Sequence, residues 1–190
     1  GFQPVEAHID APDRPRYFRG RQSAVQLVAD RSSGRLIGGT VLGDHGVEGF
    51  SLRQVAKLAG VSHAAPAHHF GDVNGLLTAL AAHGYRRLLA AQGAPEAKAA
   101  PDPRAQIVAA GLGYVDFALS SPALFLLLFG SERTDYTTPE LSVAANAAYQ
   151  HLADQVAAAG GSGPEDAGAV WAVAHGLANL MAAGRLKSLD

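Results

Sequence analysis

Histidine and aspartate side chains gather in the first half of the chain, a combination that can bind a metal ion or transfer a proton. The members of this group are Asp44, His45, His63, His68, His69 and His83. His68 and His69 follow His63 by five and six residues on one expected short helix, and three side chains at that spacing do not converge on one ion. The chain has no cysteine, which excludes disulfides and thiolate sites. We therefore expect no metal, no cofactor and no enzymatic activity, and we expect the histidines to contact a partner.

The stretch that positions these histidines, residues 51–70 (SLRQVAKLAGVSHAAPAHHF), has the pattern of two short helices. Ser51 can cap the first helix, whose apolar positions recur at helical spacing: Leu52, Val55, Ala56 and Ala59. Gly60 can take the positive φ of a tight turn, and Ser62 can cap a second helix that reaches about Phe70. Two short helices joined by a glycine-containing turn are typical of a helix-turn-helix. An αα-hairpin of an ordinary helical protein is the alternative.

A longer run, from about Arg35 to Leu89, resembles the DNA-binding domain of the TetR/AcrR family of bacterial repressors. The matching residues are GVEGFSLRQVAKLAGVS, the His69-Phe70 pair, and Asp72 followed by Leu76 and Leu77. The resemblance implies a helical domain that binds double-stranded DNA. It implies that the following residues face the major groove or its walls: Ser62, His63, Ala64, His68 and His69. It also implies contacts to DNA phosphates from Ser51, Arg53 and Gln54.

Charge is unevenly distributed along the chain. Residues 14–87 carry a net charge of +6, residues 88–190 carry −5, and the first thirteen residues carry −3. A basic front half favours an anionic polymer as partner. Aromatic residues interleave with a basic cluster near the start of the chain, formed by Arg14, Arg16, Arg19 and Arg21. In the family such an arm often follows DNA, so these arginines are candidate phosphate or minor-groove contacts; a solvated tail is an equal alternative.

Two positions depart from the family's pattern. TetR-like domains usually place a Tyr just before the pair that ends in His-Phe, and a Lys shortly after that pair, and both typically hold DNA phosphates. This chain has Ala67 and Val73 at those positions. Because phosphate contacts supply much of the affinity for DNA, we expect operator binding that is weak for the family and leans on the arginine arm.

Helical periodicity without strand-like alternation predicts an all-α fold. We expect a first helix from near Ser33 to Gly46, a short third helix because Pro66 falls within it, and a fourth helix from Asp72 to about Gln92. Residues 93–103 (GAPEAKAAPDP) read as a linker, and later helices are expected over 103–119, 123–130, 139–159 and from 164 onward. The resulting domains are a partly disordered N-terminal extension with the basic arm (1–32), a DNA-binding domain (33–92), and a ligand-binding and dimerisation domain (104–190).

The C-terminal half resembles one branch of TetR-type ligand-binding domains through YVDFALSSPALFLLLFG (114–130) and WAVAHGL (171–177). The resemblance implies a pocket for a small molecule whose binding releases DNA. Spacing places Trp171, His175 and Asn179 on one face of the last helix. The other candidate pocket residues are Tyr114, Phe117, Phe125 and Phe129, and for any single aromatic residue ordinary core packing is the stronger alternative. The many Ala, Leu and Phe residues favour an apolar or aromatic effector.

The sequence as a whole therefore predicts a homodimeric, ligand-responsive transcriptional repressor that binds a palindromic operator. Small residues along the last helix, from Ala167 to Ala183, allow close approach of a second helix in a dimer. The alternative is a helical small-molecule-binding protein with weak or lost operator binding. The longest apolar run, Ala123 to Phe129, is too short to cross a membrane, and Gly1 to Pro15 lacks an apolar signal core, so we expect a cytoplasmic protein.

Overall fold

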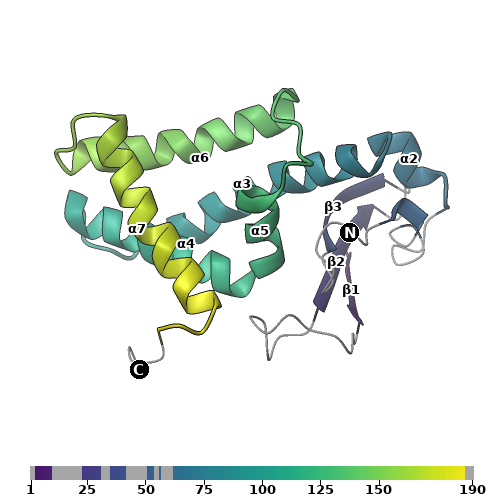
Figure 1. Cartoon of the computed structure of the whole chain (residues 1–190), viewed down its shortest axis with the longest axis horizontal. Helices are drawn as coiled ribbons and strands as arrows, with labels where there is room; N and C mark the ends of the chain where they lie inside the picture. Colours follow the sequence, from purple (N-terminus) through teal and green to yellow (C-terminus); the bar gives the residue numbers. More distant parts are fainter. Residues whose placement is uncertain are drawn as a thin grey trace. The chain divides into compact units, whose positions relative to one another are not determined.

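The computed structural model describes residues 3–9, 23–30, 35–41, 51–53, 56 and 62–186, with the backbone alone for the strands before residue 42 (Figure 1). Several predicted contacts and motif residues lie outside the described residues. They are Arg14, Arg16, Arg19, Arg21, Asp44, His45, Gln54, Val55, Ala59 and Gly60.

Three strands form an antiparallel sheet in the order β1-β2-β3, from β1 (Gln3–Ile9), β2 (Ser23–Asp30) and β3 (Arg35–Val41). In β1–β2 Val5 pairs with Leu27, and the β2–β3 register shifts between Val28 and Ala29. The helix expected from near Ser33 to Gly46 is wrong over this segment, where the structure has β3. Its two central glycines weaken a helix, and its β-branched residues suit a strand that has a partner to pair with.

The all-α fold class is confirmed for the described chain from Leu52 onward, where every regular element is a helix. Leu52, Arg53 and Ala56 are helical, and α2 spans Ala65–Phe70. Helix α2 begins two residues later than expected, with Ala64 in place of Ser62 as its N-cap. Pro66 therefore occupies the first turn, where its missing N–H costs no helical hydrogen bond.

The predicted start of the next helix is confirmed by its cap. Helix α3 spans Val73–Glu96, and the Asp72 carboxylate accepts a hydrogen bond from the Gly75 N–H at 2.8 Å. The helix extends four residues beyond the expected end at Gln92, so the first part of the predicted linker is helical. Polar contacts to Glu96, described below, hold this additional turn.

The remaining helices begin within one residue of the expected positions, each at a proline. They are α4 (Pro103–Ser120), α5 (Pro122–Gly130), α6 (Pro139–Ala158) and α7 (Pro164–Ala182). The Asp102 carboxylate caps α4 by accepting from the Ala105 N–H at 3.0 Å. Helix α7 is followed by Gly184, whose φ is 65°, and the Arg185 N–H donates to the Leu180 carbonyl at 2.8 Å. This is a Schellman motif, which a glycine in left-handed conformation allows.

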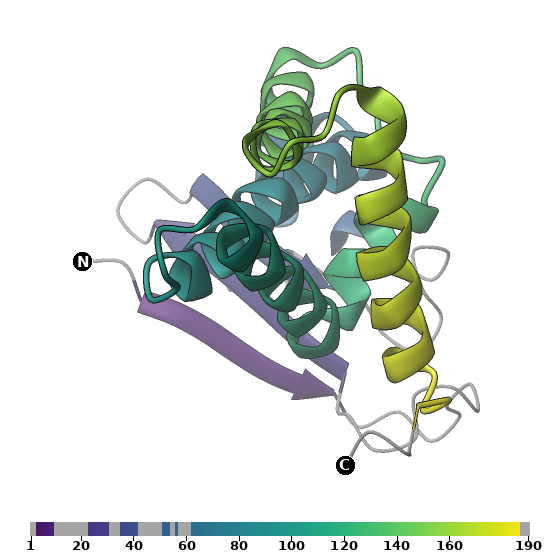
Figure 2. The ribbon, with the colours of Figure 1, turned by 90° about the vertical axis from the view of Figure 1, so that its left-hand side faces the viewer.

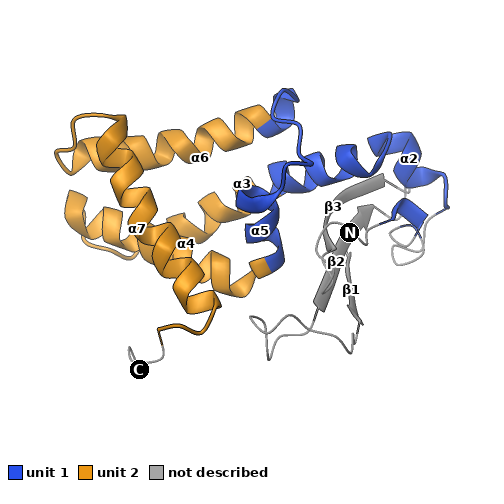
Figure 3. Ribbon diagram, in the orientation of Figure 1, with its two compact units in different colours: residues 1–83, 123–141 blue, residues 84–122, 142–190 orange. Residues whose placement is uncertain are grey.

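The chain forms two compact units (Figure 3). Unit 1 comprises residues 1–83 and 123–141, and unit 2 comprises residues 84–122 and 142–190. In unit 2, α4 and α7 are in contact, and Figure 2 shows α7 (yellow) following α6 (green) after a short loop. Within the described residues no single helix is long and apolar enough to cross a membrane; α4 and α5 meet the length and composition only when taken together across a bend.

Candidate functional sites

The residues expected to contact DNA bases lie on an exposed turn and helix of unit 1. Ser62, His63 and Ala64 form the turn before α2, and His68 and His69 lie in its last turn. All five side chains are exposed, and the rings of His68 and His69 are in edge contact at 5.4 Å between centroids. We call this set the α2 surface. Its imidazoles and hydroxyl are hydrogen-bonding groups open to an external partner.

The neighbouring positions expected to contact phosphates differ in exposure and in side-chain chemistry. Arg53 is exposed and Ser51 is partly exposed. Ala67 is exposed and Val73 is half-buried, so two positions near the α2 surface present methyl groups to their surroundings. Within the described part of the chain, no three His, Asp or Glu side chains are placed to hold a metal ion.

A polar loop, residues 131–138, is held against the start of α3 within unit 1. The Arg133 Nε donates to the Asn74 side-chain oxygen at 3.0 Å, and the Asp135 N–H donates to the Thr78 hydroxyl at 3.0 Å. Hydrogen bonds from Thr137 hold the pKa of Asp135 below its usual value. The sequence indicated a polar loop here but not its docking, because Asn74 and Thr78 are more than fifty residues away along the chain.

Three of the candidate effector residues meet in unit 2. The Tyr114 hydroxyl of α4 lies 2.7 Å from the His175 Nδ1 of α7, and the Trp171 Nε1–H donates to the same hydroxyl at 3.1 Å. The ring centroids of Trp171 and His175 are 5.6 Å apart. Which of the two groups donates in the contact between the Tyr114 hydroxyl and the His175 Nδ1 depends on the tautomer of His175. We call Tyr114, Trp171 and His175 the aromatic triad.

Burial favours the uncharged forms of Tyr114 and His175. Tyr114 is only 5% exposed, and this desolvation raises its pKa far above the usual value, although the Trp171 hydrogen bond opposes the rise. Desolvation lowers the pKa of His175. The half-buried His175 ring thus has a polar partner, the Tyr114 phenol. A neutral, directional chain of donors suits recognition of a ligand or of the fold itself better than proton transfer.

The other four candidate effector residues do not join the triad. The Asn179 side chain is exposed and donates to the His175 backbone carbonyl at 2.8 Å, within its own helix. Phe117 is 2% exposed in the core of unit 2. Phe125 and Phe129 belong to unit 1, where their rings lie 5.1 Å apart. The structure therefore brings together three of the seven residues and leaves the rest as separate features.

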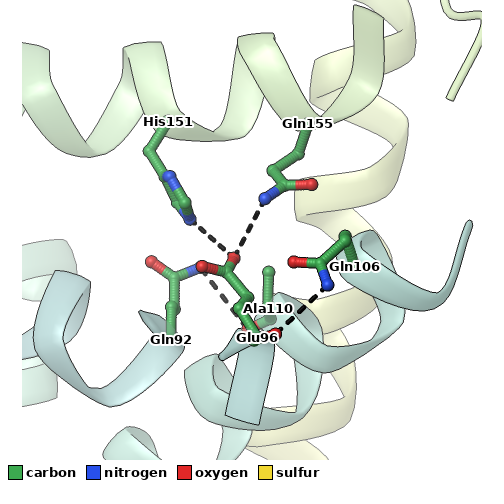
Figure 4. A network of polar contacts seen from close by, with 6 residues as sticks. All are labelled: Gln92, Glu96, Gln106, Ala110, His151 and Gln155. Atoms are coloured by element: carbon green, nitrogen blue, oxygen red, sulfur yellow. Dashed lines mark hydrogen bonds and ion pairs between the residues drawn. The ribbon is translucent and has the colours of Figure 1, made fainter. Parts of the chain in front are cut away.

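Sequence reasoning missed a second polar cluster in unit 2, drawn in Figure 4. The Glu96 carboxylate lies 2.8 Å from the His151 Nε2 and accepts from the Gln155 amide at 3.2 Å. The Gln106 amide donates to the Glu96 carbonyl at 3.1 Å. His151 and Gln155 are one helical turn apart on α6, a spacing that could have indicated a shared target. This Glu96 cluster fixes the last turn of α3.

Both a family model and a solved structure are similar to this chain. Residues 107–190 match the family described as "Tetracyclin repressor-like, C-terminal domain". A solved structure of a protein with unknown function from Rhodococcus sp. RHA1 is 37% identical in sequence, with a TM-score of 0.64. The similarity covers 76% of this chain and 78% of the Rhodococcus chain. Among curated proteins no match is found. The matched family segment contains all three residues of the aromatic triad.

Proposed function

Because the chain belongs to the tetracycline repressor-like family, we propose that it is a transcriptional repressor that binds operator DNA as a homodimer and releases it on binding a small effector. The observation that carries the proposal is the α2 surface, where exposed hydrogen-bonding side chains gather in a chain whose residues 107–190 match the repressor-like family. A repressor of this kind acts on DNA in the cytoplasm. No enzymatic step is part of the proposal.

The DNA-contacting role falls to the α2 surface and to the basic residues before it. In the proposed complex Ser62, His63, Ala64, His68 and His69 face the major groove, where imidazole and hydroxyl groups can bond to base edges or to the groove walls. Arg53, with Ser51 and Gln54, contacts phosphates. The arm that contains Arg14, Arg16, Arg19 and Arg21 adds further phosphate or minor-groove contacts.

The effector role falls to the aromatic triad. Trp171 is 43% exposed while Tyr114 is buried, so the triad runs from the surface of unit 2 into its interior. Apolar rings around a neutral hydrogen-bonded core favour an apolar or aromatic effector over a charged one. Phe117, Phe125, Phe129 and Asn179 remain candidates for the same role.

The dimer contact is proposed for α7. This helix has no charged residue from Ala167 to Gly184, and its large exposed apolar side chains are Trp171, Val173, Leu180 and Met181. An exposed apolar helix face with glycine and alanine between the larger residues suits close packing against a second copy. Helical spacing places Val173 and Leu180 on the side of α7 roughly opposite Trp171. The proposed subunit contact therefore uses Val173, Leu180 and Met181 and is separate from the aromatic triad.

Ala67 and Val73 favour one alternative, a small-molecule-binding protein with weak or lost operator binding. Selection of duplexes from a random pool by the purified protein, followed by gel retardation, separates the two. The proposal predicts an enriched, roughly palindromic sequence whose binding weakens when His68 and His69 are both changed to Ala. If no sequence is enriched while apolar ligands still bind, the repressor proposal is contradicted and the small-molecule-binding alternative is supported.

A further inference from the structure

One exposed ridge of α4 is apolar at its middle and oppositely charged at its two ends. Arg104, Val108, Leu112 and Asp116 follow one another at intervals of four residues, and all four are exposed. Val108 is 61% and Leu112 is 60% exposed, which is unusual for side chains of this size. Within the described residues neither Arg104 nor Asp116 forms an ion pair. We call these four residues the α4 ridge.

The order of charges along the α4 ridge makes it complementary to itself. We propose that the α4 ridge binds the same ridge of a second copy of this chain, antiparallel and about a two-fold axis. In this register Arg104 meets Asp116 of the partner subunit, and Val108 meets Leu112 of the partner subunit. A two-fold axis generates each pair twice. A parallel arrangement would instead place like charges opposite each other, which is unfavourable.

The surface beside the ridge fits such a contact. Residues four apart form inclined ridges on a helix, and two such ridges pack side by side when helices cross at about −50°. The neighbouring ridge of α4 contains Gly111, and a Cβ added at Gly111 would meet nothing within 4 Å. By contrast, a Cβ at Gly113 would lie 2.4 Å from the Ala91 carbonyl oxygen, so packing inside unit 2 requires that glycine. Packing inside unit 2 does not require a glycine at position 111. The missing side chain of Gly111 leaves room that the partner's ridge would occupy.

The contact goes beyond the proposed function, because the dimer proposed there uses α7. A single helix ridge is small compared with the ~1,200–2,000 Å² that stable interfaces bury. We therefore expect a weak, concentration-dependent association that joins α7 dimers into larger assemblies. Failure of this inference leaves the α7 dimer and DNA binding untouched.

Disulfide trapping tests the register directly, since the chain contains no cysteine. Val108→Cys and Leu112→Cys are prepared as separate full-length proteins, mixed, and oxidised. The proposed pairing predicts that the mixture forms the mixed disulfide several times faster than either protein forms a disulfide with itself, because only the mixed pair brings two Cα atoms within bonding range. Val143→Cys, on the 69% exposed Val143 of α6, measures random collision. All three positions are exposed, so the variants should fold, and circular dichroism checks that they do.

Charge reversal and a glycine substitution give independent readouts by sedimentation velocity. Arg104→Asp or Asp116→Arg alone should shift association to higher concentration, and the two together should restore it, because both pairs re-form with exchanged signs. Gly111→Ala should weaken association while raising the thermal unfolding midpoint by about 2–4 °C, since alanine is the better helix former. Mixed trapping no faster than the Val143→Cys control, or a double reversal that fails to restore association, would overturn the proposal.

Discussion

The histidines of the α2 surface and those of unit 2 differ in what they contact. His63, His68 and His69 in unit 1 are exposed and form no hydrogen bond to another described residue. His151 and His175 in unit 2 each lie within 2.8 Å of a polar side chain from another helix. The same residue type therefore serves two purposes. Unpartnered imidazoles on a surface remain available to an external molecule, whereas partnered ones specify how helices pack.

The first prediction tests whether the contact between Tyr114 and His175 stabilises the fold. Tyr114→Ala should lower the free energy of unfolding by about 3–5 kcal/mol, because it removes a buried ring from the core. Tyr114→Phe keeps the ring and removes only the hydroxyl shared by Trp171 and His175, so it should cost about 1–3 kcal/mol. Urea unfolding followed by circular dichroism measures both. A Tyr114→Phe variant as stable as the parent would mean that the triad adds nothing to the fold.

Replacing the carboxylate of the Glu96 cluster tests the other partnered histidine. Glu96→Ala leaves His151 and Gln155 without their shared acceptor and should cost about 1–3 kcal/mol of unfolding free energy. Glu96→Gln retains an acceptor oxygen and serves as the matched control, with a smaller loss. Equal losses for the two variants would show that the cluster contributes by shape and not by hydrogen bonding.

Replacing the exposed histidines of the α2 surface should lower DNA affinity and leave the free energy of unfolding nearly unchanged. His68→Ala with His69→Ala should change the free energy of unfolding by no more than ~0.5 kcal/mol, as for other exposed positions. The same double variant should lose operator affinity by roughly 1–3 kcal/mol for each base contact removed. Parallel urea unfolding and fluorescence anisotropy titrations measure the two effects. A large loss of stability would contradict the prediction and show that His68 and His69 stabilise the fold, as His151 and His175 are expected to do.

The dependence of stability on pH sharpens the comparison further. The pKa of His175 is lowered in the folded state, so the unfolded chain binds the proton more readily, and stability should fall as the pH drops below about 6.5. The pKa of Tyr114 is raised, so the unfolded chain ionises first, and stability should fall as the pH rises above about 10. Trp171 is the only tryptophan, and its fluorescence during urea unfolding at a series of pH values measures the loss of stability on both the acid and the alkaline side. In His175→Asn the acid-side dependence should flatten.

The smallest expected effect concerns the methyl groups beside the α2 surface. Val73→Lys supplies a cation where the family resemblance implies a phosphate contact. It should tighten binding to all duplexes and steepen the slope of log K against log salt by about 0.9. Anisotropy titrations at several salt concentrations measure the slope. Val143→Lys, on an exposed position of α6, adds the same charge elsewhere and should leave the slope nearly unchanged.

Local signals in the sequence predicted the helix starts well. Asp72 and Asp102 cap α3 and α4 as expected, and the prolines at 103, 139 and 164 mark first turns, because capping depends on residues within one turn of each other. The strands before residue 42 were missed, because strand pairing joins distant segments and the alternation in β1, where Glu6 and His8 separate Val5, Ala7 and Ile9, is too short to stand out.

The candidate site could be predicted only in part for the same physical reason. Helical spacing placed Trp171 and His175 on one face of α7. The identity of the partner of His175, Tyr114, depends on how α4 packs against α7, and the Glu96 cluster depends on how α6 packs near the end of α3. Neither packing arrangement can be read from periodicity alone.

Titration of the duplex selected from a random pool is the most direct test of the central claim, that the α2 surface binds DNA while the partnered histidines hold the fold. Anisotropy is measured for the parent, the His68→Ala/His69→Ala variant and Tyr114→Phe at one salt concentration, below the unfolding range of each. The account predicts that the double histidine variant binds at least about five-fold more weakly while Tyr114→Phe, where folded, binds like the parent. Equal binding by all three proteins would contradict the claim.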